Sequence, residues 1–217
     1  ETSVVIDSPW GTVPITTPLI GRHNIPNISA AAGSLLALGV KPQAIREGLS
    51  HLPQVPGRME QVANDIGAHI LIDYAHTADA LRLMLLSLRE LTRGRVIVLF
   101  GCGGNRDQTK RPVMGKTASL LADHVILTSD NPRGEDPMDI LHQIKRGLPE
   151  GFTHFDVIPD REQAIVAALA AARRDDTILI AGKGHESYQL FDHISVPFSD
   201  RDVVERWLTS HQTVALS

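Results

Sequence analysis

The feature that most constrains this sequence is a set of short runs that are apolar at every position. The clearest are residues 96–99, Val-Ile-Val-Leu, and residues 178–180, Ile-Leu-Ile. A strand with one face in water alternates apolar and polar residues, whereas a strand covered on both faces is apolar throughout. From about residue 57 such runs alternate with helical patterns. The sequence therefore predicts an α/β domain of the Rossmann-like, doubly wound type with a mostly parallel sheet.

The expected elements of this domain follow from the apolar periodicity and from the turn residues between the runs. Strands are predicted at residues 69–73, 95–101, 124–128, 155–158 and 177–181. Helices are predicted at residues 77–92, 109–122, 137–146 and 160–173. A hairpin over 188–197 and a helix over 201–210 complete the pattern.

The residues before this domain show a different pattern. Two alternating segments, 4–7 and 13–16, flank the turn sequence Ser-Pro-Trp-Gly and predict a hairpin. Helices are predicted at 26–38 and 42–51. Pro53, Pro56 and Gly57 then form a break, because proline fixes its own φ and restricts the residue before it. We place a domain boundary there, giving domains 1–56 and 57–217.

Composition excludes several classes of protein. The longest uninterrupted apolar run, residues 164–172, is nine residues long, and a membrane span needs about 18. The formal charge is −4, which argues against nucleic acid as a partner. The chain has one cysteine, Cys102, and it begins with no sequence of signal-peptide type. We expect a cytoplasmic protein that has neither a membrane nor nucleic acid as partner.

Two loops resemble nucleotide motifs without matching them. The loop 101–107 begins Gly-Cys-Gly-Gly, but Arg106 occupies the position of the third glycine of a dinucleotide fingerprint. The tripeptide at 115–117, Gly-Lys-Thr, would need a glycine at position 110 to complete a phosphate loop, and that residue is Lys110. We therefore expect this chain by itself neither to bind ATP tightly nor to hydrolyse it.

Charged residues follow three of the predicted strands. Because the carboxyl ends of parallel strands meet at one edge of a sheet, these residues are expected to lie together. Arg106 and Arg133 offer planar forks for carboxylates, and Asp130 and Glu186 offer anions for an ammonium group. This combination suits an amino acid with more than one charged end. A structural interpretation stays open, since Asn131-Pro132 and the glycines of 182–186 are also turn-forming.

His76 and Cys102 are weaker candidates. His76 follows a predicted strand, where it is open to roles as a base, a metal ligand or a satisfied polar group. Cys102 has no evident histidine partner, so we expect it not to be catalytic. The ten histidines form no H-E-x-x-H pattern, and no cysteine pair exists to complete a zinc site. No metal site and no catalytic residue are assigned.

Taken in order, six segments resemble successive blocks of the Mur ligase family, ATP-dependent amino-acid ligases of peptidoglycan synthesis. They are residues 21–27, 57–60, 73–77, 101–107, 130–133 and 182–186. The resemblance covers essentially the whole chain and is closest to the branch of the family that adds diaminopimelate. Its most discriminating element is Asp-Asn-Pro-Arg at 130–133, because lysine-adding relatives usually lack that arginine.

The resemblance implies a role for particular residues. The family's diaminopimelate-contacting positions match Arg106, Asp130, Asn131, Pro132, Arg133, Gly182 and Glu186. The positions that approach the adenine, phosphate and ribose of ATP match Asn24, Asn27, Arg58 and Asp73.

The resemblance also implies a reaction. The family uses ATP and Mg²⁺ to phosphorylate the D-glutamate side chain of UDP-N-acetylmuramoyl-L-alanyl-D-glutamate, and the amine of meso-diaminopimelate then attacks the acyl phosphate. Residues 1–56 match the end of the family's central ATP-binding α/β domain, and 57–217 match its Rossmann-like amino-acid-binding domain. The family's UDP-sugar domain, phosphate loop, magnesium-binding glutamate and carbamylated lysine have no counterpart in this sequence.

We therefore expect a piece of a longer ligase that is inactive alone, with most ligands for ATP and Mg²⁺ outside it. Two alternatives remain: a lysine-adding or other Mur-type ligase, and a non-catalytic amino-acid-binding module.

Overall fold

A computed structural model describes residues 2–215, so residues 1, 216 and 217 of the two predicted domains lie outside the described part. The chain divides into two compact units, the first ending at Val55 and the second beginning at Pro56. None of the described helices is both long and apolar enough to cross a membrane.

The first unit is a hairpin covered on one face by two helices. Strands β1 (Thr2–Ser8) and β2 (Gly11–Thr17) pair antiparallel, with Ser8 opposite Gly11 at the turn. Helices α1 (Asn24–Ala37) and α2 (Pro42–Ser50) follow. Their buried residues join the inward side chains of β2 in one core, formed by Val13, Ile15, Ile28, Ala32, Leu36, Ile45 and Leu49. The predicted hairpin and both predicted helices are confirmed.

The second unit contains a six-stranded sheet in the order β3-β4-β8-β5-β6-β7. Its strands are β3 (Glu60–Val62), β4 (His69–Asp73), β5 (Val96–Phe100), β6 (His124–Leu127), β7 (Phe155–Val157) and β8 (Thr177–Ala181). All neighbouring pairs are parallel except β3 with β4, which is antiparallel. The predicted α/β fold with a mostly parallel sheet is confirmed. Strand β3 is an addition that the sequence pattern did not reveal.

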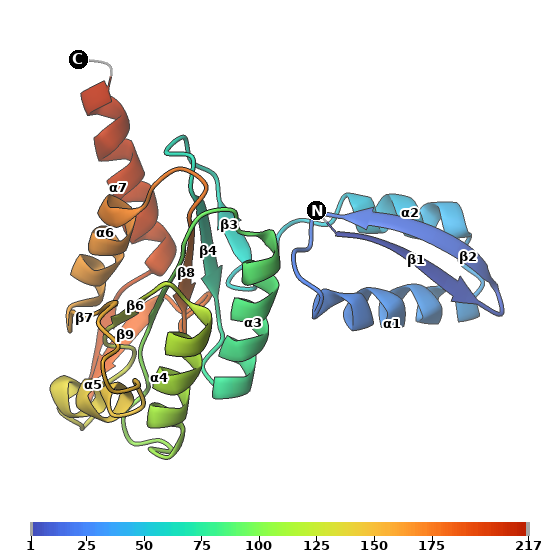
Figure 1. Ribbon diagram of the computed structural model, residues 1–217. Helices are drawn as coiled ribbons and strands as arrows, with labels where there is room; N and C mark the ends of the chain where they lie inside the picture. The colour runs from blue at the N-terminus through green and yellow to red at the C-terminus, as the bar shows by residue number, and fades with distance from the viewer. Residues whose placement is uncertain (1, 216–217) are drawn as a thin grey trace. The chain divides into compact units, whose positions relative to one another are not determined.

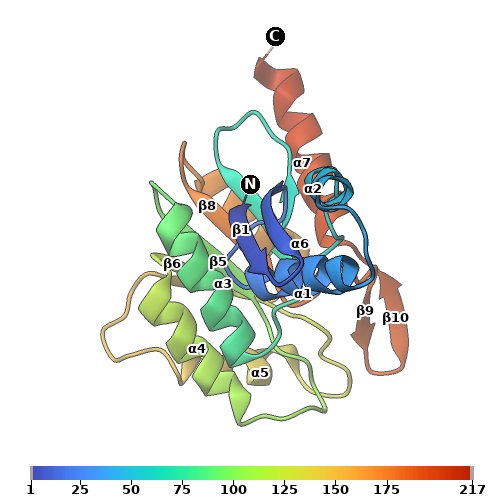
Figure 2. The same ribbon diagram turned by 90° about the vertical axis from the view of Figure 1, so that its right-hand side faces the viewer.

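Helices cover both faces of this sheet, as Figure 1 and Figure 2 show. Helices α3 (Ala78–Leu91), α4 (Lys110–Leu121) and α5 (Pro137–Lys145) lie side by side on one face. Helices α6 (Arg161–Ala171) and α7 (Asp200–Ala215) cover the other. The core under α6 and α7 takes every second strand residue, such as Ile70 and Ile72, while Leu71 between them is also buried. Burial on both faces explains why these strands have no polar alternation.

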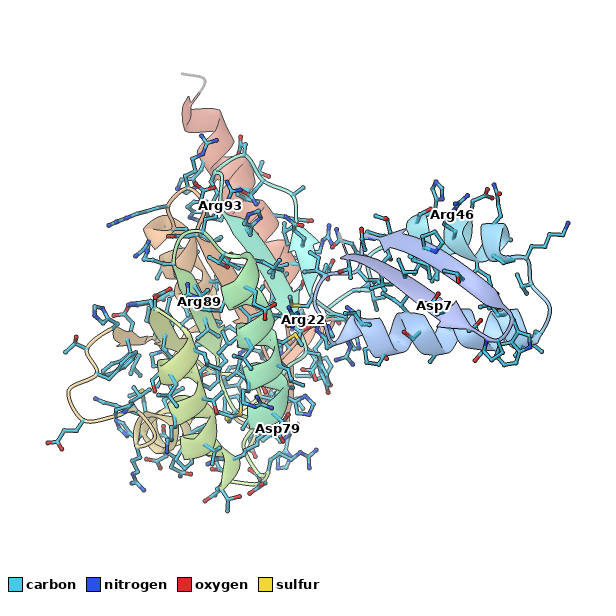
Figure 3. All side chains as sticks on the ribbon, turned by 45° about the vertical axis from the view of Figure 1, so that its right-hand side comes forward. Asp7, Arg22, Arg46, Asp79, Arg89 and Arg93 are labelled. Atoms are coloured by element: carbon cyan, nitrogen blue, oxygen red, sulfur yellow. The ribbon has the colours of Figure 1, made fainter. Side chains whose placement is uncertain are left out.

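Local signals explain the helix boundaries. The Thr77 side chain accepts a hydrogen bond from the Ala80 backbone N–H, and this cap starts α3. Asp79 lies in the first turn of α3 and Arg89 in the last, as Figure 3 shows, and both charges suit the helix dipole. Asp136 and Asp160 cap α5 and α6 in the same way as Thr77. The last elements are the hairpin of β9 (Tyr188–Phe191) with β10 (Ile194–Pro197), and α7.

Candidate functional site

Four neighbouring strands of the second unit direct their loops to one edge of the sheet. Strand β8 is the last parallel strand in the chain, yet it inserts between β4 and β5. The loops after β4, β8, β5 and β6 therefore follow one another along the carboxyl edge. These loops contain the residues that the sequence analysis assigned to a diamino acid.

The loop after β6 contains four buried polar residues, two of them predicted to bind the diamino acid, and a half-buried arginine. Asp130 is 9% exposed and Asn131 is 4% exposed. Arg133 has a left-handed φ of 52°, and its Nη1 donates to the backbone carbonyls of Gly104, at 3.0 Å, and Asn131, at 3.4 Å. The backbone N–H of Arg133 donates to Leu190 O at 2.9 Å, so hairpin β9–β10 holds this residue in place.

The loop after β5 interlocks with the loop after β6. The Gly104 backbone N–H donates to Asn131 O at 2.9 Å. A Cβ at Gly104 would lie 1.7 Å from Pro132 O, so a side chain at 104 cannot fit at this approach. A Cβ at Gly103 would lie 2.8 Å from Arg133 Nη1 and 3.6 Å from Arg106 Cγ. Both predicted carboxylate-binding arginines therefore lie against Gly103.

The loop after β8 brings Glu186 to Asn131. The Asn131 Nδ2 donates to Glu186 Oε2 at 3.0 Å. The backbone at Gly182 has a left-handed φ of 113° and its N–H donates to Asp73 O at 3.0 Å. The structure thus brings the seven predicted diaminopimelate residues, Arg106, Asp130, Asn131, Pro132, Arg133, Gly182 and Glu186, to the loops of one edge of the sheet.

The four residues predicted to approach ATP are divided between the units. Asn24 and Asn27 lie at the start of α1 in the first unit, where Asn27 Nδ2 donates to Asn24 Oδ1 at 3.3 Å. Arg58 and Asp73 lie in the second unit. Arg58 is exposed, with its guanidinium carbon 4.8 Å from the centre of the Tyr74 ring. Asp73 is 6% exposed, and its carboxylate accepts backbone N–H groups from Met59 and Ala75, both at 2.8 Å.

The two weaker candidates have ordinary surroundings. His76 is exposed, and its Nδ1 lies 2.9 Å from Tyr74 O. Cys102 is 2% exposed, and its Sγ lies 3.6 Å from Met114 Sδ. Burial raises the pKa of the Cys102 thiol to about 12, so the reactive thiolate is scarce. In the described part of the chain, no group of three or more His, Cys, Asp or Glu side chains is arranged to hold a metal ion.

Three buried cations were missed by the sequence analysis. Arg111 is fully buried and forms a bidentate pair with Glu135, at 2.7 and 3.0 Å, while Glu135 also accepts from the Asn105 backbone N–H at 2.5 Å. This pair joins the start of α4 to the loops around Gly103, whose carbonyl also accepts from Arg111 at 3.1 Å. Arginine usually lies in solvent, so its position in a sequence gives no sign of burial.

The other two cations are Arg161 and Lys183, which are also buried. Arg161 donates to both oxygens of Asp200, at 2.7 and 2.8 Å, and to the backbone carbonyls of Ser129 and Ala181, at 3.3 and 3.0 Å. Arg161 therefore fixes the ends of β6 and β8. The third cation is Lys183, with no exposed surface, in the loop that contains Glu186. A lysine between two glycines after a central strand is the one sequence signal that could have indicated it.

Comparison with known proteins agrees with this geometry. The family model described as "Mur ligase, glutamate ligase domain" matches residues 57–184. A UDP-N-acetylmuramoyl-L-alanyl-D-glutamate–2,6-diaminopimelate ligase of Gloeobacter violaceus is 45% identical over 95% of this chain and 42% of its own. The enzyme of the same name in Geobacter metallireducens is 44% identical over 91% of this chain and 42% of its own.

Solved structures agree as well. A diaminopimelate ligase of that name has a TM-score of 0.73 at 34% identity, covering 97% of this chain and 46% of its own. The UDP-N-acetylmuramate–alanine ligase of Thermotoga maritima has a TM-score of 0.68 at 18% identity, covering 94% of this chain and 40% of its own, which supports the fold alone. This chain therefore spans less than half the length of the relatives that it matches. On the family model and the identities together, the chain belongs to the Mur ligase family.

Proposed function

We propose that this chain is the amino-acid-binding part of a cytoplasmic, ATP-dependent ligase. The full-length protein would add meso-diaminopimelate to UDP-N-acetylmuramoyl-L-alanyl-D-glutamate in peptidoglycan precursor synthesis. The observation that carries the proposal is that Asn131 forms hydrogen bonds with both Arg133 and Glu186. Its backbone carbonyl accepts from the Arg133 guanidinium, and its side-chain amide donates to Glu186. A fork for a carboxylate and an acceptor for an ammonium group are thereby joined through one residue.

The charges of this edge match the charges of the proposed substrate. Diaminopimelate carries two amino groups and two carboxylates, and it differs from lysine by the second carboxylate. Arg133 and Arg106 are the groups that we assign to carboxylates, since a guanidinium pairs with them in bidentate geometry. Asp130 and Glu186 are assigned to an ammonium group. Lysine would leave Arg133 without a ligand partner.

We assign the two units to two parts of the full-length enzyme. Residues 1–56 are proposed as the end of the central ATP-binding domain, and residues 57–217 as the amino-acid-binding domain. Asn24, Asn27, Arg58 and Asp73 remain the proposed nucleotide residues. One related fold, at 22% identity, is titled a complex of the Escherichia coli protein FolC with ADP.

The described residues fit the nucleotide only in part. The exposed Arg58 can meet a phosphate group. The Asp73 carboxylate, by contrast, already accepts two backbone N–H groups. ATP and Mg²⁺, when bound, would supply the phosphoryl group and offset its charge. We propose that their other ligands belong to the rest of the full-length protein.

The contribution of this chain to the reaction is positioning. The charged groups of the edge would hold the diamino acid by its ends, so that one amine faces the activated carboxyl group of the second substrate. Fixing two reactants in this way replaces a bimolecular encounter with an effectively unimolecular step. No side chain of this chain is assigned as a base.

The test is the choice between diaminopimelate and lysine by the full-length protein. We expect a higher kcat/KM for diaminopimelate in the wild type. Arg133→Ala should weaken diaminopimelate binding by about 2–5 kcal/mol, the range for truncating one partner of a desolvated charge pair. The binding of lysine should weaken much less. Arg133→Lys should recover only part of the diaminopimelate binding, because an ammonium cannot form the bidentate pair.

Arg89→Ala is the matched control, because Arg89 pairs at 2.7 Å with Asp123, which directly precedes β6 at the opposite edge of the sheet. An unchanged ratio of the two kcat/KM values in Arg133→Ala would exclude the proposed role of Arg133. A wild-type preference for lysine would favour a lysine-adding ligase. Diaminopimelate binding without ligase activity would favour a non-catalytic binding module.

A further inference from the structure

Lys183 is a buried cation at the centre of the proposed diaminopimelate residues. It follows β8, which lies between β4 and β5 in the sheet. The flanking residues Gly182 and Gly184 both have left-handed φ angles, 113° and 53°, which few other residues adopt without strain. These two glycines turn the chain so that the lysine side chain lies in the interior, with 0% of the residue exposed.

The Lys183 ammonium contacts three residues that are proposed to bind ligand. Its Nζ donates to Asn131 Oδ1 at 3.2 Å and to Glu186 Oε2 at 3.1 Å. It also lies 3.7 Å from Asp130 Oδ1, a buried atom without a hydrogen bond among the described residues. The Tyr188 ring lies beside it, with its centre 5.6 Å from Nζ.

These contacts determine which way the Asn131 amide points. Its Oδ1 accepts from Lys183 Nζ and also from the Leu190 backbone N–H at 3.0 Å. The Nδ2 end must then face away from both donors, and it donates to Glu186 Oε2. That oxygen now has two donors, Lys183 and Asn131. The carboxylate is held in one orientation, which leaves Oε1 for another donor.

Lys183 also sets the charge of the cluster. Two carboxylates in a poorly hydrated site repel each other, and a buried cation offsets that repulsion. The carboxylates of Asp130 and Glu186 with one ammonium leave one net negative charge. That charge suits a single ammonium group of a ligand.

We infer that Lys183 is a positioning residue, which holds Asp130, Asn131 and Glu186 in the arrangement that receives an ammonium group of the diamino acid. It does not touch the ligand, because its side chain has no exposed surface. The inference rests on the proposed function for the identity of the ligand. A residue that only stabilised the fold would affect both substrates and ATP alike.

The first experiment compares Lys183→Met and Lys183→Arg in the full-length protein. Lys183→Met keeps the chain length and removes the charge and donors. We expect KM for diaminopimelate to rise about 10- to 100-fold, from the loss of hydrogen bonds to charged groups, while KM for ATP stays unchanged. Lys183→Arg keeps the charge and should recover part of the loss. If Lys183→Met does not fold, Lys183→Gln keeps an amide donor, and the same selective rise is expected.

Arg95→Met is the matched control. Arg95 pairs with the buried Asp176 at 2.6 Å, at the amino ends of β5 and β8. Its loss should lower the melting temperature and leave KM for diaminopimelate unchanged. An unchanged KM for diaminopimelate in Lys183→Met, or equal increases in both KM values, would overturn the inference.

A second measurement needs no ligand. The side-chain NH2 group of Asn131 should give one sharp pair of proton resonances, which together are the amide signal, in the NMR spectrum of the wild type. In Lys183→Met that signal should shift and broaden, because one of the two donors to Oδ1 is gone. An unchanged signal would overturn the positioning role. If the wild type fails to bind diaminopimelate, the proposed function fails, and the amide signal still decides the role of Lys183.

Discussion

Asp73 is one of the residues proposed to bind the nucleotide, and it also supports its own loop. Its carboxylate accepts the backbone N–H groups of Met59 and Ala75, so the segment 57–60 depends on it. Met59 has a left-handed φ of 46°, which its neighbours must maintain. Arg58, next to Met59, has an exposed side chain. Arg58 and Asp73 are proposed to bind the same ligand, but only the loss of the Asp73 side chain should destabilise the fold.

This difference can be measured. Asp73→Ala should reduce ATP-dependent turnover of the full-length enzyme and also lower the free energy of unfolding, by about 1–3 kcal/mol for each buried N–H left without a partner. Arg58→Ala should reduce turnover with little change in stability. Kinetics and urea unfolding of both variants test this. Equal losses of diaminopimelate and ATP binding in Arg58→Ala would contradict the nucleotide assignment.

Cys102 is expected to be inert in the folded protein. Burial raises the pKa of its thiol to about 12, so at about pH 8 nearly all of it is protonated. Iodoacetamide should label the protein only after unfolding in urea. Mass spectrometry reads this directly, since the chain has one cysteine. Rapid labelling of the native protein would show that the loop 101–107 opens.

The sequence reveals some of these residues and conceals others. Arg106, Arg133 and Glu186 follow predicted strands, and a charged residue in such a loop is visible as a candidate. The burial of Lys183 and Arg111 cannot be predicted in this way, because only tertiary packing decides that a cation lies in the interior. The orientation of the Asn131 amide likewise depends on Leu190, 59 residues later in the chain.

At the scale of elements, α6 and α7 are joined by one buried ion pair and one exposed ion pair. Arg161 and Asp200 are fully buried, whereas Arg206 and Glu162 are more than half exposed. Burial disfavours the charge on Arg161, but the Asp200 carboxylate outweighs that cost and raises the pKa of the guanidinium. The Arg161 guanidinium therefore stays charged, and it also holds the ends of β6 and β8 through the backbone carbonyls of Ser129 and Ala181.

Removing one partner of the buried Arg161–Asp200 pair should therefore lower the free energy of unfolding substantially. Arg161→Met leaves Asp200 buried and unpaired, and we expect a loss of about 3–5 kcal/mol in the free energy of unfolding. The double variant Arg161→Met/Asp200→Leu should lose less than the sum of the single losses. Arg206→Met, on the same two helices, should cost less than about 1 kcal/mol. Urea unfolding of these three variants and of Asp200→Leu alone measures the losses, and equal losses for Arg161→Met and Arg206→Met would contradict the argument.

Elements with local signals were predicted closely, and those without were not. Thr77, Asp136 and Asp160 mark helix starts that the sequence states plainly. Strand β3 has three residues and no recognisable alternation, so the pattern missed it. The insertion of β8 between β4 and β5 is a property of the whole sheet, since each of these strands has a buried apolar centre that does not specify its neighbours. Helix α7 continues to Ala215, beyond the predicted end at Ser210.

For the molecule as a whole, stability should depend on pH through a few carboxylates of the second unit. Hydrogen bonds from Arg111 lower the pKa of Glu135, and those from Thr109 lower the pKa of Asp107. Burial opposes the charge on Asp176, but hydrogen bonds from Arg95 and the backbone outweigh it and lower its pKa. A lowered pKa in the folded state means that the unfolded chain takes up protons first as the pH falls.

The stabilisation from these three groups should be complete above their ordinary pKa values, at about 4, and be lost as the pH falls through the lower folded values. Thermal melts from about pH 7 to about pH 3 should show this decline. Glu135→Gln, which cannot ionise, should melt lower at neutral pH and show a shallower decline. A melting temperature that is independent of pH over this range would contradict the prediction.

Arg133 adopts a left-handed φ of 52°, a conformation that costs a residue with a side chain roughly 1–2 kcal/mol. Glycine would adopt it freely, so Arg133→Gly is expected to relieve strain while deleting the fork proposed for the distal carboxylate. At position 133, substrate discrimination therefore favours arginine, whereas relief of backbone strain favours glycine. Laboratory evolution of this domain for heat resistance alone would favour the loss of its specificity, and selection for both traits would have to find its stability elsewhere.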